Sequence, residues 1–586
     1  MRCRWAFFFL VLIAAMSATA VRSSPPSSNG PQVPVGLGWH ADGLLRVALR
    51  DARQVASIDP KTWKVTARHD LPFRPISIAS SHDLATLYVG GMDGEVLALR
   101  SDSETLIRKA SRTGPARVLS LSKGRVAVAT TWDRSVWILD GKSETSIRSL
   151  PLGFSPGAMI LRPDGRIIVA DAFGGKLAEI DPNSDKVRTR TIDGVNLRAL
   201  AISGDGKELL IGHMTQYGPV PVTGTNIDWG LVLSSRLSAV PLDEFEADDR
   251  DGEALTRRRL TLDGSGHGAA DPSAMVVSRG GDLVLISLAG SHQILKNDRT
   301  LDQKTAAPGR LPLGNYQRLE VKDVGQSPMD LVLDPTGEFV ISADAMSDTL
   351  SVLQVDDLSR VSTVLLGANE SPPSRTEAQR GEAHFLDGRR SLDRWMSCSS
   401  CHHAGHTNGL NFDTLGDGSY GAAKNTPSLL GVGPTAPFSW TGRFETLDAQ
   451  VHQSLVSSLR GPTPGNEVVM EISAYLRSLA PPPPRQPDEL NARRGAEVFV
   501  DRRCDRCHLE PTYTSAGIKY IALDDGAGGH NAFNTPSLRG VGWSAPYLHD
   551  GRASSLDEVF DLHPPGLSTP LTSAERRSLK AFLESL

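Results

Sequence analysis

The sequence predicts a multidomain chain in which an all-β part built from repeated units precedes two related, mainly α-helical modules. Three observations support this fold class: a repeat of 41 residues in the N-terminal part, a second repeat with an offset of 109 residues near the C-terminus, and one cysteine motif in each copy of that second repeat. The chain has 586 residues, which is too long for one ordinary domain. Its 39% hydrophobic residues suffice for packed cores, which excludes a disordered or collagen-like chain.

The charge balance disfavours nucleic acid as a partner. The chain has 62 Lys and Arg against 67 Asp and Glu, a formal net charge of −5. Proteins that bind nucleic acid normally carry a basic surplus that neutralises phosphates. We therefore expect no nucleic-acid partner.

The N-terminus has the pattern of a secretory signal peptide at residues 1–20. A short basic start is followed by an apolar stretch from Trp5 to Ala15 and by small residues up to Ala20. The apolar stretch is shorter than the roughly 20 residues that a membrane span needs. A cleaved signal is therefore favoured over an anchor, and we expect an exported, periplasmic protein with no membrane span after cleavage.

The 41-residue repeat predicts a seven-bladed β-propeller over residues 36–370. A period of 40–45 residues with short apolar strands between turn residues is typical of propeller blades. The positions just before the second strand of each predicted hairpin are Asp42, Asp83, Gly124, Gly165, Gly206, Gly281 and Gly337. The pattern is similar to that of the YVTN-type and lactonase-like propellers of exported bacterial proteins.

Four of the five cysteines form two copies of one motif, C-x-x-C-H. The members are Cys398, Cys401 and His402, then Cys504, Cys507 and His508. Two thiols at this spacing can form thioethers with the two vinyl groups of one haem, while the adjacent histidine binds the iron. A zinc site and a pair of disulfide or thioredoxin-like redox sites are the alternatives, and both leave the histidines unexplained. The motifs therefore predict two covalently bound haem c groups.

The segments after the two motifs are copies of each other. Residues 425–443 read NTPSLLGVGPTAPFSWTGR, and residues 534–552 read NTPSLRGVGWSAPYLHDGR. This duplication predicts two cytochrome c modules at residues 376–480 and 489–586. The proline-rich segment 481–488 between them predicts a stiff, extended linker.

With these motifs, residues 376–586 resemble the bacterial di-haem cytochrome c peroxidase family, which includes enzymes that mature methylamine dehydrogenase. The resemblance implies an oxidoreductase that reduces hydrogen peroxide, or another small oxidant, at the first haem. Electrons would come from a small redox protein, a cytochrome c or a cupredoxin, and enter through the second haem.

The resemblance also implies roles for individual residues. Trp440 and Arg443 correspond to the catalytic W-x-G-R segment of the first copy, with Trp440 as the electron bridge between the haems. Asn425 and the backbone carbonyls of Ser544 and Pro546 correspond to the ligands of a calcium ion between the modules.

The sequence departs from the family at the sixth ligand of the second iron. His563 lies 14 residues after His549, where the family usually has a methionine, and no methionine follows Met470. We therefore predict that His563 is an iron ligand, with a helix-end histidine as the alternative.

The sixth ligand of the first iron is less defined, because the loop at residues 413–420 has no obvious strong ligand. An open position would suit peroxide. The residues that could close it are His403, His406, Tyr420, His452 and Met470, of which we favour His452. The family's distal carboxylate has no match, since Arg460 stands near its place.

Two intervals between the propeller turns exceed the period and predict long loops on one face. The first runs from Gly206 to Gly281 and contains His213, Tyr217, Trp229, His267 and an acidic stretch from Asp243 to Asp251. This interval forms either a solvated surface insertion or a loop that covers a haem edge or selects the redox partner.

Two alternative functions remain open at this point. In one, both irons are six-coordinate and the protein only carries electrons, with the propeller as a docking module. In the other, an open haem oxidises a protein substrate, as the maturation enzymes of the resembled family do.

Overall fold

A computed structural model gives the structure of the chain. The residues that it describes are 30–100, 103–109, 114–143, 146–246, 252–255, 257–299, 319–367, 374–520, 523, 529–562 and 569–586. The predicted signal peptide at residues 1–20 and the predicted ligand His563 lie outside these ranges.

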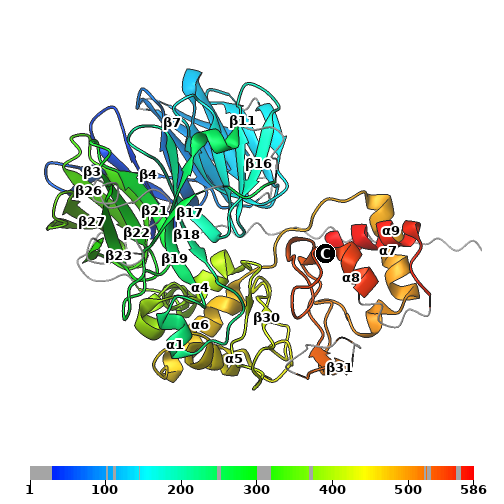
Figure 1. Cartoon of the computed structure of the whole chain (residues 1–586). Coiled ribbons are helices and arrows are strands. Elements are labelled where there is room, and N and C mark those ends of the chain that lie inside the picture. Colours follow the sequence, from blue (N-terminus) through cyan, green and yellow to red (C-terminus); the bar gives the residue numbers. More distant parts are fainter. Residues whose placement is uncertain are drawn as a thin grey trace, which may run out of the picture.

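The N-terminal part is a seven-bladed β-propeller, as the repeat predicted (Figure 1). Each blade is a four-stranded antiparallel sheet whose strands follow one another in sequence. Blades one to three contain β1 (Pro34–Trp39), β2 (Leu45–Leu49), β3 (Gln54–Asp59), β4 (Lys64–Asp70), β5 (Pro75–Ser80), β6 (Thr86–Gly91), β7 (Val96–Arg100), β8 (Glu104–Arg108), β9 (Ala116–Ser120), β10 (Arg125–Thr130), β11 (Ser135–Asp140) and β12 (Ser146–Pro151). Blades four to seven contain β13 (Pro156–Leu161), β14 (Ile167–Asp171), β15 (Lys176–Ile180), β16 (Val187–Thr191), β17 (Val195–Ile202), β18 (Glu208–Thr215), β19 (Ser234–Pro241), β20 (Arg258–Thr261), β21 (Pro272–Val277), β22 (Leu283–Leu288), β23 (Gln293–Asp298), β24 (Leu319–Asp323), β25 (Pro328–Leu333), β26 (Phe339–Asp344), β27 (Thr349–Gln354) and β28 (Arg360–Leu365).

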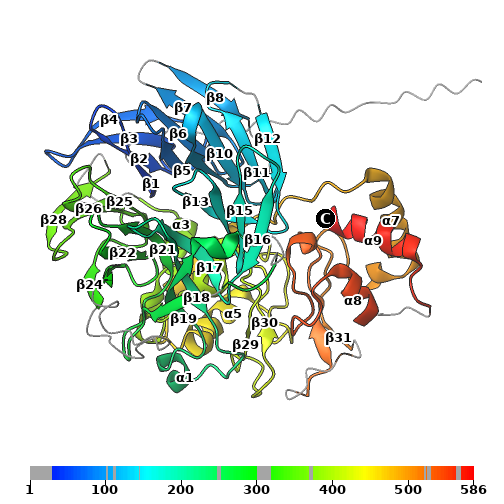
Figure 2. The same ribbon diagram turned by 45° about the horizontal axis from the view of Figure 1, so that its top comes forward.

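All seven predicted turn positions lie between the first and second strands of their blades. Gly165 and Gly206 have φ angles of 86° and 72°, a conformation that glycine adopts without a steric penalty. The first strands of the blades pack side by side around the centre, which Figure 2 shows as a ring of sheets. Buried aliphatic side chains fill the space between neighbouring blades.

Side-chain hydrogen bonds join the last blade to the first and close the ring. The Asp348 carboxylate accepts hydrogen bonds from the backbone amides of Gln32 and Val33, both at 2.8 Å. The indole of Trp39 donates to the carbonyl of Leu333 at 2.7 Å. These bonds are needed because no strand of one blade is exchanged into another.

Two helical modules follow the propeller. The first contains α3 (Glu377–Phe385), α4 (Cys398–Cys401), α5 (Leu447–Gln453), a π-helix (Ser454–Ser458), α6 (Asn466–Ser478), β29 (Asn411–Phe412) and β30 (Lys424–Asn425). The second contains α7 (Glu489–Asp501), α8 (Leu556–Leu562), α9 (Ser573–Glu584), β31 (Ile518–Tyr520) and β32 (Ala532–Asn534). Leu479 to Asp488 connect them without a helix or strand.

The two modules use the same helix crossing. α3 packs against α6, and α7 packs against α9. Gly381 and Gly495 lie at these crossings, where an added Cβ would come within 1.9 Å of the Glu471 carbonyl oxygen and 2.0 Å of the Ser578 carbonyl oxygen. Only glycine allows the backbones to approach so closely.

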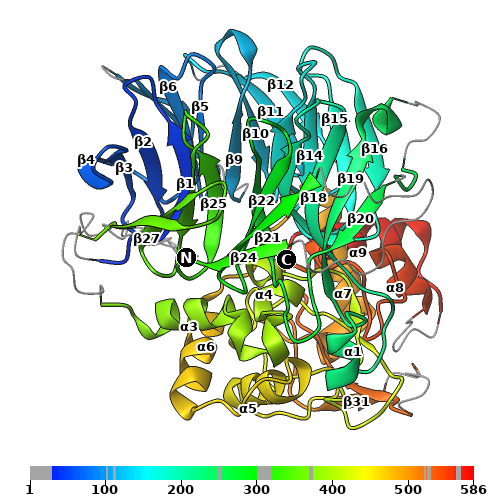
Figure 3. The ribbon, with the colours of Figure 1, turned by 60° about the vertical axis from the view of Figure 1, so that its left-hand side comes forward.

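The first module lies against one face of the propeller, as Figure 3 shows for α3, α4 and α6. A buried ion pair joins Arg50 to Glu382 of α3 through two hydrogen bonds of 2.6 and 2.7 Å. The second module lies to one side, at the far end of the linker (Figure 1).

The long interval between Gly206 and Gly281 does not form one loop. His213 is a buried residue of β18, and β19 and β20 complete the fifth blade within the interval. The insertion proper is residues 216–233 between β18 and β19, and it contains the short helix α1 (Gly224–Asp228). Part of the acidic stretch lies outside the described residues.

In the described part of the chain, no helix is both long and apolar enough to cross a membrane.

Candidate functional site

The first C-x-x-C-H motif forms a single helical turn whose start is held by serine side chains. The Ser397 hydroxyl accepts a hydrogen bond from the amide of Ser399, and the Ser397 amide donates to the Ser400 hydroxyl, which together cap α4. Both hydroxyls also donate to the buried carboxylate of Asp271 in the propeller, at 2.6 and 2.8 Å. The propeller therefore fixes the turn that carries Cys398 and Cys401.

The four cysteines are not joined in disulfides. Burial raises the pKa of Cys398 to about 12 and that of Cys504 to about 11, so these thiols are protonated at neutral pH. The second motif forms a 3-10 turn at Cys504–Arg506. Both pairs are thus reduced thiols within one turn, as thioether attachment requires.

A cavity of about 450 Å³ opens beside the first motif. Cys398, Cys401 and His402 line it, together with α5, the π-helix and the segment 412–417. It continues to residues 534–548 of the second module. Its size falls within the range of about 300–1,000 Å³ that is usual for cofactor sites.

Both motif histidines are neutral at pH 7. Burial lowers the pKa of His402 to about 4, against a smaller opposite effect of backbone carbonyls that include Pro427. Burial also lowers the pKa of His508, whose Nδ1 lies 3.0 Å from the carbonyl oxygen of Tyr513. A neutral imidazole keeps a lone pair for a metal, so thiols, histidine and cavity together fit a covalently attached haem.

The two modules meet through a reciprocal, pseudo-twofold contact. The Asn425 side chain donates to the Pro546 carbonyl at 2.6 Å, and the Asn534 side chain donates to the Pro437 carbonyl. The backbone amide of Asn425 donates to the His549 carbonyl, and that of Asn534 donates to the Trp440 carbonyl. Trp440 and His549 are equivalent positions of the duplicated segment.

Trp440 lines the cavity at this contact between the modules, and its indole donates to the Asn425 carbonyl at 2.7 Å. Arg443 is exposed instead and does not line the cavity. Its guanidinium donates to the carbonyl of Gly416 at 2.7 Å, so it supports the cavity-lining loop from outside.

Two of the three predicted calcium ligands, Asn425 and Pro546, lie in direct contact. The Oδ1 atom of Asn425 is buried and has no hydrogen-bond partner among the described residues. The side chain of the third, Ser544, donates to the carbonyl of Gly540.

The structure separates the residues that could have closed the first iron's sixth position from the cavity. His403 and His406 face the propeller, where the imidazole of His406 packs against Phe173 at 4.6 Å. Tyr420 and Met470 are 67% and 54% exposed. His452 is exposed on α5 and does not line the cavity, so we do not retain it as a ligand.

The wall of the cavity formed by residues 447–459 carries amides, hydroxyls and apolar side chains only. The polar ones are Gln450, Gln453, Ser454, Ser457 and Ser458. Gln450 and Gln453 each donate to the serine four residues later, at 3.0 Å. Sequence reasoning missed this wall, although the repeated Gln-to-Ser spacing of four residues on a helix was the available signal.

Sequence reasoning also missed the apolar side of the cavity that the propeller supplies. Val222 and Val232 of the insertion line the cavity, and both are 1% exposed. No local pattern shows which distant module an insertion will contact.

Two duplicated modules, each with a C-x-x-C-H turn and one opening on a large cavity, define a di-haem c-type cytochrome region joined to a β-propeller. Residues 375–479 match the family model of the di-haem cytochrome c peroxidases. The C-terminal part of the chain is therefore a di-haem cytochrome c peroxidase domain of the MauG type, and the chain is an oxidoreductase of this kind.

Similar proteins include members with different activities. The methylamine utilization protein MauG of Methylorubrum extorquens is 27% identical, over 43% of this chain and 89% of that protein. The cytochrome c551 peroxidase of Nitrosomonas europaea is 23% identical, over 37% of this chain and 81% of that protein. The structure of hydrazine synthase from Kuenenia stuttgartiensis matches with a TM-score of 0.49 and 20% identity, over 58% of this chain and 99% of that chain.

Proposed function

We propose that this protein is an exported peroxidase that reduces hydrogen peroxide at the haem held by Cys398 and Cys401. Electrons from a small redox protein, a cytochrome c or a cupredoxin, would arrive through the haem held by Cys504 and Cys507. The observation that carries this proposal is the wall at residues 447–459. It offers no histidine, methionine, lysine or tyrosine to the cavity, which favours an open coordination position.

The bound haem would supply an iron that accepts electrons and binds a small ligand. The chain's own residues prepare the site around it. His402 is held neutral by burial and can bind the iron. The Oε1 atom of Gln450 is buried without a hydrogen-bond partner among the described residues, so it can accept a hydrogen bond from bound peroxide.

The polar wall has no carboxylate that could move a proton during cleavage of the O–O bond. The Arg460 side chain, near the place of the family's carboxylate, donates instead to the Val222 carbonyl at 2.9 Å. The hydroxyls of Ser454 and Ser457 are the polar hydrogens left along the wall, and we assign proton movement to them and to water.

For the second haem we propose His508 and His563 as axial ligands and Trp440 as the electron bridge. The position of Trp440 in the contact between the modules supports the bridge. We also propose a calcium ion held by Asn425 and the carbonyls of Ser544 and Pro546, which would neutralise the carbonyl dipoles that meet there. Metal analysis should find one calcium per chain and none in Asn425→Ala.

Electron paramagnetic resonance of the haem-loaded protein tests the proposed function. We expect a high-spin signal from the first haem and a low-spin signal from the second, with the high-spin signal changing when peroxide is added after half-reduction. Cys398→Ser/Cys401→Ser should remove the high-spin signal and halve the haem content.

Two other results would replace the proposal. Two low-spin signals that do not respond to peroxide would assign the protein as an electron carrier. A high-spin signal that reacts with peroxide, without turnover in the presence of a reduced donor, would point to oxidation of a protein substrate.

A further inference from the structure

The propeller insertion at residues 216–233 reaches the first haem cavity across the domain boundary. In the sixth blade, the equivalent connection between the second and third strands is only residues 289–292. The insertion instead extends away from the sheets, and α1 lies among the helices of the first module (Figures 1 and 3).

The backbone of Val222 is held between two segments that line the cavity. Its amide donates to the carbonyl of Asp413 at 2.8 Å, and its carbonyl accepts from the Arg460 side chain at 2.9 Å. Asp413 belongs to the lining loop, and Arg460 follows directly after the π-helix wall. Val222 therefore spans the gap between the two segments.

Further contacts keep the insertion in this position. Pro221 forms a parallel β-bridge with Asp413, and the Gln216 side chain donates to the Asn411 carbonyl at 2.7 Å. Within the insertion, Thr223 caps α1 and the Asn226 side chain donates to the Pro221 carbonyl at 2.7 Å. The backbone on both sides of Val222 is thus hydrogen-bonded.

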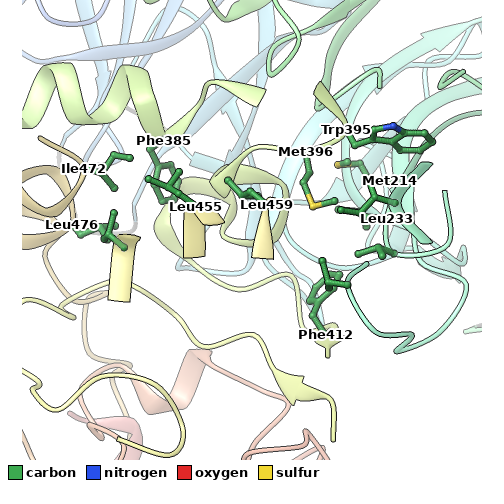
Figure 4. Packing of buried hydrophobic residues seen from close by; sticks show 14 of the residues in the cluster. Met214, Leu233, Phe385, Trp395, Met396, Phe412, Leu455, Leu459, Ile472 and Leu476 are labelled. Carbon is green, nitrogen blue, oxygen red and sulfur yellow. The ribbon is translucent and has the colours of Figure 1, made fainter. Parts of the chain in front are cut away.

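Apolar packing fixes the base of the insertion. Met214 and Leu233, at its two ends, lie against Met396 and Trp395 just before the first C-x-x-C-H motif (Figure 4). Both residues are fully buried. The insertion is therefore part of the packed core of the first module and is not a solvated loop.

We infer that residues 216–233 limit the size of the molecules that reach the first haem, with Val222 and Val232 as the size-selecting side chains. The apolar valines face the cavity, while the opposite polar groups are neutral amides and hydroxyls. The cavity therefore favours small, uncharged molecules that can form hydrogen bonds, which is the class to which hydrogen peroxide belongs. The inference rests on the open position assumed in the proposed function.

Ligand binding to the haem-loaded full chain tests this inference without measuring turnover. Stopped-flow absorbance would give the association rates of two iron ligands, small hydrogen cyanide and larger imidazole. In Val222→Ala we expect imidazole to bind at least about ten-fold faster, with cyanide within about two-fold of the parent, because one or two methyl groups in an apolar pocket discriminate to this extent.

Two further variants keep the test sharp. Val222→Leu keeps the core filled and should slow imidazole by about ten-fold, opposite to Val222→Ala. Trp229→Ala changes a side chain of the same insertion that is 69% exposed, and it should leave both rates unchanged.

Equal changes in both rates, or changes of imidazole binding in the same direction for alanine and leucine, would overturn the inference. Peroxide turnover, measured separately, distinguishes this failure from that of the proposed function. A protein that does not turn over peroxide but shows the opposite imidazole effects would disprove the peroxidase activity and support size selection.

Discussion

At the scale of single residues, the propeller buries several carboxylates that are not paired with cations. Asp344 is 0% exposed and accepts hydrogen bonds from the hydroxyls of Ser342 and Ser351, at 2.7 and 2.6 Å. Burial raises its pKa to about 6, against the opposite effect of these hydroxyls. Hydroxyl partners can donate or accept, so they can also satisfy an uncharged side chain at this position.

We predict that Asp344→Asn reduces the loss of stability on going from pH 4 to pH 7. The folded parent holds the proton more tightly than the unfolded chain, so its free energy of unfolding falls as pH rises through about 6. A shift of about two pKa units corresponds to about 3 kcal/mol, which the asparagine variant would not lose. Urea unfolding at both pH values measures this, with the exposed Asp185→Asn as a control. Equal losses in parent and variant would refute the prediction.

The polar cavity wall leads to a second prediction at this scale. Gln450→Leu removes the buried acceptor, and we expect peroxide reduction to slow by about 10- to 100-fold, as loss of one positioned polar group in an active site does. Haem content and the high-spin signal should stay unchanged.

His452→Ala is the matched control for Gln450→Leu, because His452 lies on the same helix but is exposed and outside the cavity. Its activity should equal that of the parent. Loss of activity in His452→Ala, or full activity in Gln450→Leu, would contradict the assignment of this wall.

At the scale of elements, one aromatic side chain joins the propeller, the linker and both modules. The Trp543 ring lies between the guanidinium groups of Arg134 and Arg485, at 5.0 and 5.1 Å from its centre. Its indole donates to the Pro483 carbonyl at 2.8 Å, and its carbonyl lies 3.1 Å from Nε2 of His406. The linker is therefore held by side-chain contacts as well as by its prolines.

We predict that Trp543→Leu loosens the second module without unfolding it. Loss of two cation–π contacts should cost about 1–4 kcal/mol at the junction. Amides at residues 403–406 and along the linker should then exchange hydrogen faster, while α7 and α9 keep their protection because their crossing is unchanged. Trp229→Leu, an exposed tryptophan, is the control. Unchanged exchange at the linker would show that the junction does not hold the module.

The elements also show how far the sequence could be interpreted. The blade turns and the duplicated helices were predictable because turn chemistry and the crossing glycines are local features that recur at constant spacing. The insertion was not, because the contact of Val222 with Asp413 joins residues far apart in the sequence. The same limit applies to His452, whose helix was predictable but whose outward orientation depends on the packing of α5.

At the scale of the whole molecule, the propeller and the first module share buried polar contacts. Asp271 accepts from Ser397 and Ser400 and lies 3.4 Å from the Arg198 guanidinium. The His292 imidazole lies 3.0 Å from the Asp387 carboxylate across the same boundary. Removing one partner of such a network leaves the others buried and unsatisfied.

We therefore predict that Asp271→Ala destabilises the propeller and the first module together by about 3 kcal/mol, since two buried hydroxyls lose their acceptor. The first haem should also be attached less completely than the second, because the turn that carries its cysteines loses support. Haem staining of the separated peptides and urea unfolding measure these effects. Asp185→Ala, on an exposed propeller strand connection, should change neither, and a loss confined to the propeller would contradict the coupling.

The insertion in the fifth blade also has a consequence for how this protein could diversify. A hairpin loop in a propeller can change in length and sequence without disturbing the blades, because its ends are fixed by the adjacent strands. Here that freely variable segment supplies one side of a haem cavity in another domain. Selection could therefore alter which molecules reach the iron by changing residues 216–233 alone, while the duplicated haem-binding sequence stays constant. The same loop is the natural place to graft or randomise when a new substrate range is sought.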